Sequence, residues 1–339
     1  MLQRTEGKLY NNVIHIYLPD CSEHVKLTPM RRPSTLAQLD LEIPDLPLRA
    51  KSLIATMFGD SIAPHGGTAW LGALIALAAP FGINERSVRT TVFRLSAEGW
   101  LVGGQVGRRS HYSLTESGRR RFEAAFRRIY AAELPAWQGE WCLVIEGPDL
   151  PRERRKALEE ELGWLGFGRF GSGLLAHPGV DDATVAAALQ GLGVTEQVLT
   201  LRAAAGSGPF AEPLPALVRQ AWDLDRLEAD YGAFLARFRP VLAAMQGRAD
   251  ADPERSFVVR TLLIHEYRRV MLRDPQLPLA LLPASWPGAA ARTLTRNLYA
   301  LTQQAAESHL RATLDTPDGP LPPPAPYFYE RFGGIGATA

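Results

Sequence analysis

The sequence predicts an α+β multidomain fold with a winged helix-turn-helix, a ferredoxin-like middle domain and a helical C-terminal domain. Three observations lead to this prediction. Helical apolar spacings precede a glycine-tipped hairpin between residues 48 and 115, segments in the order β-α-β-β-α-β occupy 141–201, and long helical periodicities fill 215–314. The 339 residues are enough for several domains, and 46% hydrophobic content is ordinary for a globular protein.

We expect five segments along the chain. They are an unassigned extension over 1–47, the winged helix with a linking helix over 48–135, the middle domain over 136–205, the helical domain over 206–315, and a Pro/Gly-rich tail over 316–339. Gly206, Gly208 and Pro209 mark the border between the middle and helical domains. Aromatic residues at 327–332 could anchor the tail to a core.

Three helices and a hairpin make up the expected winged helix. Apolar residues recur with helical spacing up to Phe58, and Thr68 is expected to cap a second helix. Asn84 caps the third helix, whose apolar face repeats at spacings of four and three residues. Strand-like runs at 100–105 and 110–115 then flank a basic turn, and Ser117 is expected to cap the linking helix.

Charge in this region points to a polyanionic partner. Residues 84–128 contain ten arginines and four acids, whereas the whole chain has a formal net charge of only +1. A local basic surplus on a helix triplet with a hairpin favours double-stranded DNA. The candidate DNA-binding residues are Arg86, Ser87, Arg89, Thr90, Phe93, Arg94, Arg108 and Arg109. The alternatives are a solvated amphipathic helix, solvated turn arginines, and a Phe93 side chain packed against the hairpin.

The middle domain raises an enzyme hypothesis that the sequence supports weakly. Small CRISPR-associated nucleases share its element order, and Glu146 and Asp149 follow the first predicted strand. Metal-dependent cleavage of phosphodiesters normally needs several oxygen ligands, so we favour a dimerisation or scaffold role. We expect no catalytic residue, no metal site and no cofactor.

The helical domain contains a candidate site for an anionic ligand. His265, Arg268 and Arg269 share a face of the helix predicted over 253–273. The alternatives are an interdomain salt-bridge network or a satisfied core histidine.

We expect a cytoplasmic protein without a membrane partner. The longest apolar stretch, 70–83, is interrupted by glycine and proline, and the N-terminus lacks the pattern of a signal peptide. Cys21 and Cys142 are too far apart in sequence to define a disulfide framework.

Several motifs resemble the PaaX family of phenylacetic acid degradation repressors. They are Trp70-Leu-Gly72, Phe81-Gly-Ile-Asn-Glu-Arg-Ser-Val-Arg-Thr90, Glu98-Gly-Trp-Leu101, His265-Glu-Tyr-Arg268 and Trp286-Pro-Gly288, within a resemblance that covers residues 48–314. The resemblance implies a GntR-like winged helix, a middle domain like the CRISPR-associated nucleases, and a helical domain for effector binding and dimerisation. It also implies a homodimeric repressor of phenylacetate catabolic genes that an aryl-CoA effector, typically phenylacetyl-CoA, releases from its operator. A site for such an effector needs cations and an apolar slot, which His265, Tyr267, Arg268, Arg269 and Trp286 could supply. An enzyme that processes a coenzyme A thioester through the helical domain is the alternative.

Overall fold

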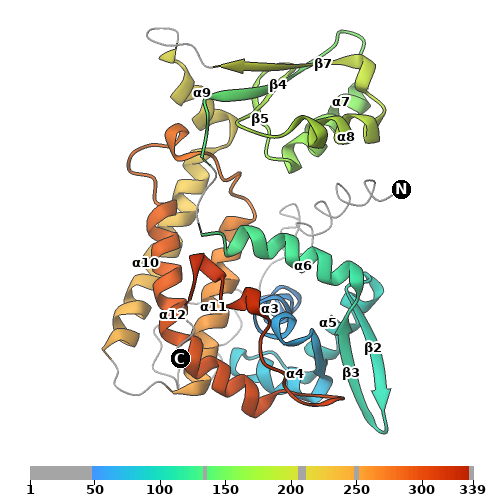
Figure 1. The fold of residues 1–339 in the computed structure, drawn as a ribbon, viewed down its shortest axis with the longest axis vertical. Helices are drawn as coiled ribbons and strands as arrows, with labels where there is room; N and C mark the ends of the chain where they lie inside the picture. Colours follow the sequence, from blue (N-terminus) through green and yellow to red (C-terminus); the bar gives the residue numbers. More distant parts are fainter. Residues whose placement is uncertain (1–47, 133–135, 205–210, 248–251, 336–339) are drawn as a thin grey trace. The chain divides into compact units, whose positions relative to one another are not determined.

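A computed structural model describes residues 48–132, 136–204, 211–247 and 252–335. The chain divides into two compact units. Of the described residues, one unit, called the middle unit here, contains those within 136–230 and 273–287. The other, called the larger unit, contains those within 48–132, 231–272 and 288–335. Figure 1 shows the elements of both units.

The first part of the larger unit places helices beside a three-stranded antiparallel sheet in the order β1-β3-β2. Its elements are α3 (Ala50–Met57), β1 (Thr68–Trp70), α4 (Leu71–Ala78), α5 (Glu85–Ala97), β2 (Leu101–Val106), β3 (Arg109–Leu114) and α6 (Glu116–Ile129). The β2–β3 hairpin and the helices around it agree with the expectation from sequence.

Two expected helix caps are wrong. Thr68 belongs to strand β1, where it pairs with Ser113 and its hydroxyl donates to the Ser113 hydroxyl at 2.9 Å. Helix α6 is capped by Thr115, whose Oγ1 accepts from the Gly118 backbone N–H at 2.9 Å, two residues before the expected Ser117. Thr68 starts a strand because its partner lies 45 residues away, where local pattern analysis does not reach, whereas the Thr115 cap is a local contact that the choice of Ser117 overlooked.

The helical region contains four helices: α9 (Leu214–Ala221), α10 (Leu224–Gln246), α11 (Pro253–Met271) and α12 (Gly288–Thr313). The helical periodicity that begins at residue 215 is divided between α9 and α10, because Asp223 between them has a φ of 47°. Helix α11 is the centre of the larger unit, where it packs against α12, α3 and α6. Helices α11 and α12 and most of α10 are therefore in one unit with the first part of the chain, whereas α9 and residues 273–287 belong to the middle unit.

The C-terminal segment also joins the larger unit. It forms a short hairpin, β8 (Asp315–Thr316) and β9 (Gly319–Pro320), and then two single turns of 3-10 helix. Phe328 and Phe332 are buried, and the Phe332 backbone N–H donates to the Tyr130 carbonyl at 2.9 Å. The tail through residue 335 thus seals the core, as its aromatic residues suggested.

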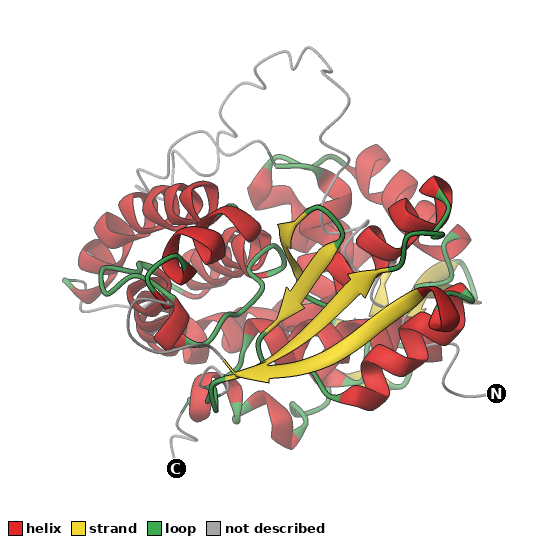
Figure 2. Cartoon of the chain, turned by 90° about the horizontal axis from the view of Figure 1, so that it is seen from above, coloured by secondary structure: helices red, strands yellow, loops and turns green. Residues whose placement is uncertain are grey.

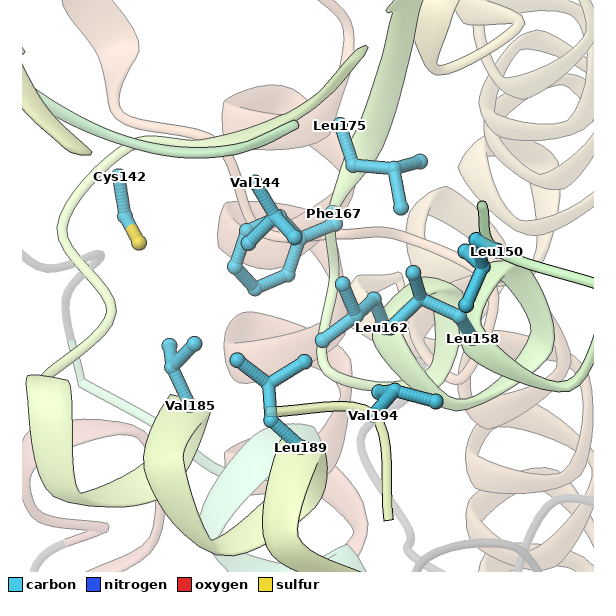
Figure 3. Packing of buried hydrophobic residues seen from close by; sticks show 10 residues of the cluster. All are labelled: Cys142, Val144, Leu150, Leu158, Leu162, Phe167, Leu175, Val185, Leu189 and Val194. Carbon is cyan, nitrogen blue, oxygen red and sulfur yellow. The ribbon is translucent and has the colours of Figure 1, made fainter. Parts of the chain in front are cut away.

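The middle unit has the ferredoxin-like order predicted from the sequence. Its elements are β4 (Glu140–Glu146), α7 (Arg152–Trp164), β5 (Gly168–Gly171), β6 (Leu174–His177), α8 (Asp182–Leu192) and β7 (Val198–Ala204), with strands in the order β5-β6-β4-β7 (Figure 2). Leucines of α7 and α8 pack on Cys142, Val144 and Leu175 of the sheet (Figure 3). The apolar face of each helix therefore explains why both cover the same side.

Candidate nucleic-acid interface

Helix α5 exposes a cationic face because its apolar face is fixed in the core. The Asn84 side chain caps the helix by accepting from the Ser87 N–H at 2.9 Å, and Val88, Val92 and Leu95 are buried. Four cationic or polar side chains on the other face are exposed, and Ser87 is half-buried; the exposed four are Arg86, Arg89, Thr90 and Arg94. All candidate residues on this helix thus reach solvent together.

Phe93 lies on the same face and is 71% exposed. The alternative that it packs against the hairpin is therefore not what the structure shows. A large apolar side chain held in water on a cationic helix is available for contact with a base or with a thymine methyl group.

Arg89 is the only arginine of this face for which the structure shows an ion pair among the described residues. Its guanidinium lies 2.7 Å from the Glu85 carboxylate one turn earlier, and both side chains are more than half exposed. An exposed pair of this kind contributes about 0.3 to 0.5 kcal/mol, so an incoming ligand can break it at little cost.

A groove lies between the first turn of α3 and α5. It has a volume of about 520 Å³ and is lined by Arg49, Ala50, Lys51, Ser52, Asn84, Arg86, Ser87, Thr90, Thr91 and Arg94. Sequence analysis missed Arg49 and Lys51. One feature of the sequence could have identified them. The start of the first helix has two cations and no acid, and positive charges there interact unfavourably with the helix dipole.

The two arginines at the hairpin turn differ in environment. Arg108 is exposed. Arg109 stacks over the Trp70 ring at 4.1 Å from the ring centroid, and its guanidinium lies 3.3 Å from the Asp315 carboxylate of β8. The C-terminal hairpin therefore already neutralises one of the two predicted contacts.

The candidate effector residues lie mostly in the protein core. The His265 ring nitrogen Nδ1 is 3.0 Å from the Thr56 hydroxyl, and Arg268 donates to the Ser52 carbonyl at 2.7 Å. Burial, and then the charges of Arg268 and Arg269, hold the pKa of His265 well below its usual 6.5, so the ring is neutral. This is the satisfied core histidine that the sequence left open as an alternative.

The other three candidates are distributed differently. Tyr267 is buried against Phe234 at 5.6 Å between ring centroids. Arg269 is 38% exposed and pairs with Glu266 at 2.8 Å. Trp286 belongs to the middle unit. An effector pocket formed by these five residues stays a prediction.

A buried charge cluster around Asp60, which the sequence did not reveal, joins the π-helical turn after α3 (Phe58–Ile62) to the helical region and the tail. The Asp60 carboxylate lies 3.1 Å from Arg260 and 3.0 Å from Arg331, and it accepts from the Tyr130 hydroxyl at 2.6 Å. Arg260 also pairs with Glu307 at 2.7 Å. All these side chains come from elements far apart in sequence, so no local pattern could identify the cluster.

The pKa values in this cluster follow from charge and burial together. Burial alone would raise the pKa of Glu307, but Arg260 and the hydrogen-bonded His65 outweigh it and lower the pKa from 4.5 to about 2. Burial, and then the charge of Asp60, raise the pKa of Tyr130 well above its usual 10. The acid is therefore ionised and the phenol neutral at neutral pH.

The middle unit offers little that resembles a nuclease centre. Glu146 is 2.6 Å from Arg155 and Asp149 is exposed. In the part of the chain that the structure describes, no three His, Cys, Asp or Glu side chains are grouped so as to hold a metal ion. In the same part, no helix has both the length and the apolar character needed to cross a membrane.

Fold and site together define a multidomain α/β protein that presents a cationic helix beside a basic groove. Family models match it in three parts: PaaX-like protein at residues 49–118, PaaX protein central Cas2-like domain at 134–213, and PaaX-like protein C-terminal domain at 222–312. The chain belongs to the PaaX family, which confirms the resemblance found in its motifs.

Two individual proteins are similar over most of the chain. The transcriptional repressor PaaX of Escherichia coli (strain K12) is 40% identical over 292 residues, which cover 86% of this chain and 92% of that protein. A solved structure of an uncharacterised protein from Mycobacterium tuberculosis has a TM-score of 0.50 and 25% identity, and the match covers 76% of this chain and 97% of that one.

Proposed function

We propose that the chain is a cytoplasmic, DNA-binding transcriptional repressor of phenylacetate catabolic genes, released from its operator by an aryl-CoA such as phenylacetyl-CoA. The observation that carries the proposal is the face of α5, on which Arg86, Arg89, Thr90 and Arg94 all reach solvent together. A solvent-facing cationic helix next to an antiparallel hairpin is the arrangement that a winged helix-turn-helix uses to enter the major groove. The relative named as a transcriptional repressor supports the same function.

The early positions of α5 are assigned to the bases and the later ones to the DNA backbone. Arginine forks match the acceptors of guanine, and residues near the N-terminus of a recognition helix lie closest to the base edges. Arg86 and Arg89 occupy those positions, whereas Arg94 is in the last turn. Arg108 at the exposed turn of the hairpin would contact phosphate, which positions the protein without specifying sequence.

We propose that the protein binds its operator as a homodimer, with the middle domain as the dimerisation element. Strand β7 is at one edge of that sheet, and Leu199 and Leu201 on it are 53% and 43% exposed. An edge strand with exposed leucines is suited to pair with another chain. Two copies would place two α5 helices on one operator, as palindromic half-sites require.

Effector release is proposed to act on the contacts between α11 and α3. An effector lowers DNA affinity only if it binds better to a conformation that misplaces α5, with a coupling of about 1 to 3 kcal/mol. Among the predicted effector residues, Arg269 has a partly exposed guanidinium, while His265 and Arg268 contact α3 directly. Ligand binding near this part of α11 would therefore change the position of α3, the first helix of the DNA-binding part.

A gel-shift experiment on the promoter next to the gene tests the proposal. The Arg89→Ala variant is expected to bind the operator about 1 to 3 kcal/mol more weakly and to accept substitutions at one base pair, because a bidentate base contact is lost. Arg296→Ala removes an exposed arginine of α12 in the same unit and serves as the matched control.

Phenylacetyl-CoA, coenzyme A and phenylacetate are added in parallel to the wild-type complex. Release by the thioester alone is the expected result. Absence of any specific shift with the wild-type protein would contradict the repressor assignment, and equal binding of Arg89→Ala and wild type would exclude Arg89 from the interface.

A further inference from the structure

The groove between α3 and α5 combines several sources of positive potential. Arg49 at the N-cap of α3 and Lys51 in its first turn line one side, and Arg86 and Arg94 line the other. The N-terminal ends of both helices open into the same groove, since Asn84 and Ser87 are also part of its lining. Each helix N-terminus carries roughly half a positive charge, so the two ends add to the side-chain charges.

The described residues leave most of this charge without compensation. Lys51 is offset by Glu98 at 2.7 Å. In the described part of the chain, by contrast, no ion pair is formed by Arg49, Arg86 or Arg94. No acid occupies the first turn of α3, where a carboxylate would be favoured and where cations cost stability. A local arrangement that opposes folding without a visible benefit is typical of a binding site.

We propose that this groove is a clamp for a backbone phosphate of DNA and that Arg49 contacts this phosphate. Arg49 is not among the DNA-binding residues that the sequence predicted. The inference rests on the proposed function, because it places one strand of the duplex along α3 while α5 enters the major groove. Concave surfaces lined by one sign of charge concentrate the field that an anion experiences. Arg86 and Arg94 of α5 also line the groove, so one DNA duplex can contact α5 and the groove at the same time.

The clamp makes a prediction that differs from that for Arg89. A phosphate contact releases about 0.9 counterion, so its loss lowers the salt dependence by that amount and does so for every DNA sequence. Arg49→Ala is therefore expected to weaken operator and non-operator DNA by the same factor. Between 50 and 200 mM salt, the loss of affinity should also be smaller by about 3.5-fold than for the wild type.

Fluorescence anisotropy with the full chain tests this over a series of salt concentrations. The variants are Arg49→Ala, Arg49→Lys, which keeps the charge and should keep the wild-type slope, and Arg296→Ala as the control. An unchanged slope of affinity against salt for Arg49→Ala would overturn the clamp. Operator binding by the wild type in the same experiment would leave the proposed function standing. Weakening of operator DNA alone would also overturn it, because it would indicate a base contact.

A second arm separates the DNA backbone from a free phosphoester. Coenzyme A is titrated by calorimetry into wild type and Arg49→Ala without DNA. Equal heats from both proteins agree with the clamp. Binding that Arg49→Ala abolishes would assign the groove to a free phosphate ligand and overturn the assignment to DNA.

Discussion

Asp60→Asn is expected to destabilise the larger unit strongly, because it removes a carboxylate that neutralises two fully buried guanidiniums. After the substitution Arg260 still pairs with Glu307 at 2.7 Å, whereas among the described residues Asp60 is the only carboxylate that pairs with Arg331. Arg331 then keeps its hydrogen bonds to the Tyr299 hydroxyl and to the carbonyl of residue 60 at 3.0 Å, and its contacts with aromatic rings such as Tyr130, 4.3 Å away. The cost therefore falls mainly on Arg331.

Breaking a buried ion pair by removing one partner costs about 3 to 5 kcal/mol, since an uncompensated charge stays in the core. We expect the free energy of unfolding to fall by this amount and Tm to fall by roughly 6 to 20 °C, at about 2 to 4 °C per kcal/mol for a unit of this size. Urea and thermal denaturation followed by circular dichroism measure both quantities. Asp318→Asn, an exposed aspartate of the same unit, is the control. A loss below about 1 kcal/mol would refute the view that Asp60 holds the turn after α3 to the helical region.

Two further predictions concern charges near the DNA-binding part. Asp315→Asn should free Arg109 to contact a phosphate, so that DNA binding tightens and the slope of log affinity against log salt steepens by about one. Asp318→Asn should change neither quantity. Weaker DNA binding by Asp315→Asn in the anisotropy assay would argue against competition between Asp315 and phosphate. Because the pKa of Glu307 is lowered from 4.5 to about 2, its stabilisation is present above pH 4.5 and is lost as pH falls toward 2. The difference in unfolding free energy between wild type and Glu307→Gln should shrink over that range, and a constant difference would contradict it.

Local patterns predicted helix α5 well because its signals are local. Asn84 as a cap and the spacing of Val88, Val92 and Leu95 fix both the start of α5 and the face that it buries. The exposed side follows by exclusion, which is why the arginines of α5 were identified correctly as solvent-facing. The ferredoxin-like order was equally accessible, since strand-length apolar runs alternate with amphipathic helices.

Sites that depend on distant partners were not accessible in this way. Strand β1 is three residues long, and its Thr68 resembles a helix cap until Ser113 is beside it. His265 and Arg268 have the spacing of a ligand pocket, yet the structure places them against Thr56 and Ser52. A buried polar side chain and a ligand-binding one share the same chemistry, so only the neighbours distinguish them.

The sequence by itself determined the family, the cationic face of α5 and the order of the elements other than β1 and the break between α9 and α10, because these depend on residues within about one helix or hairpin of one another. Only the tertiary structure decided that the C-terminal helices and tail form one core with the first part of the chain. The physical reason is the Asp60 cluster, because a buried carboxylate is stable only when cations neutralise it. Here the cations are the guanidiniums of residues 260 and 331, about 200 and 270 positions away in the sequence.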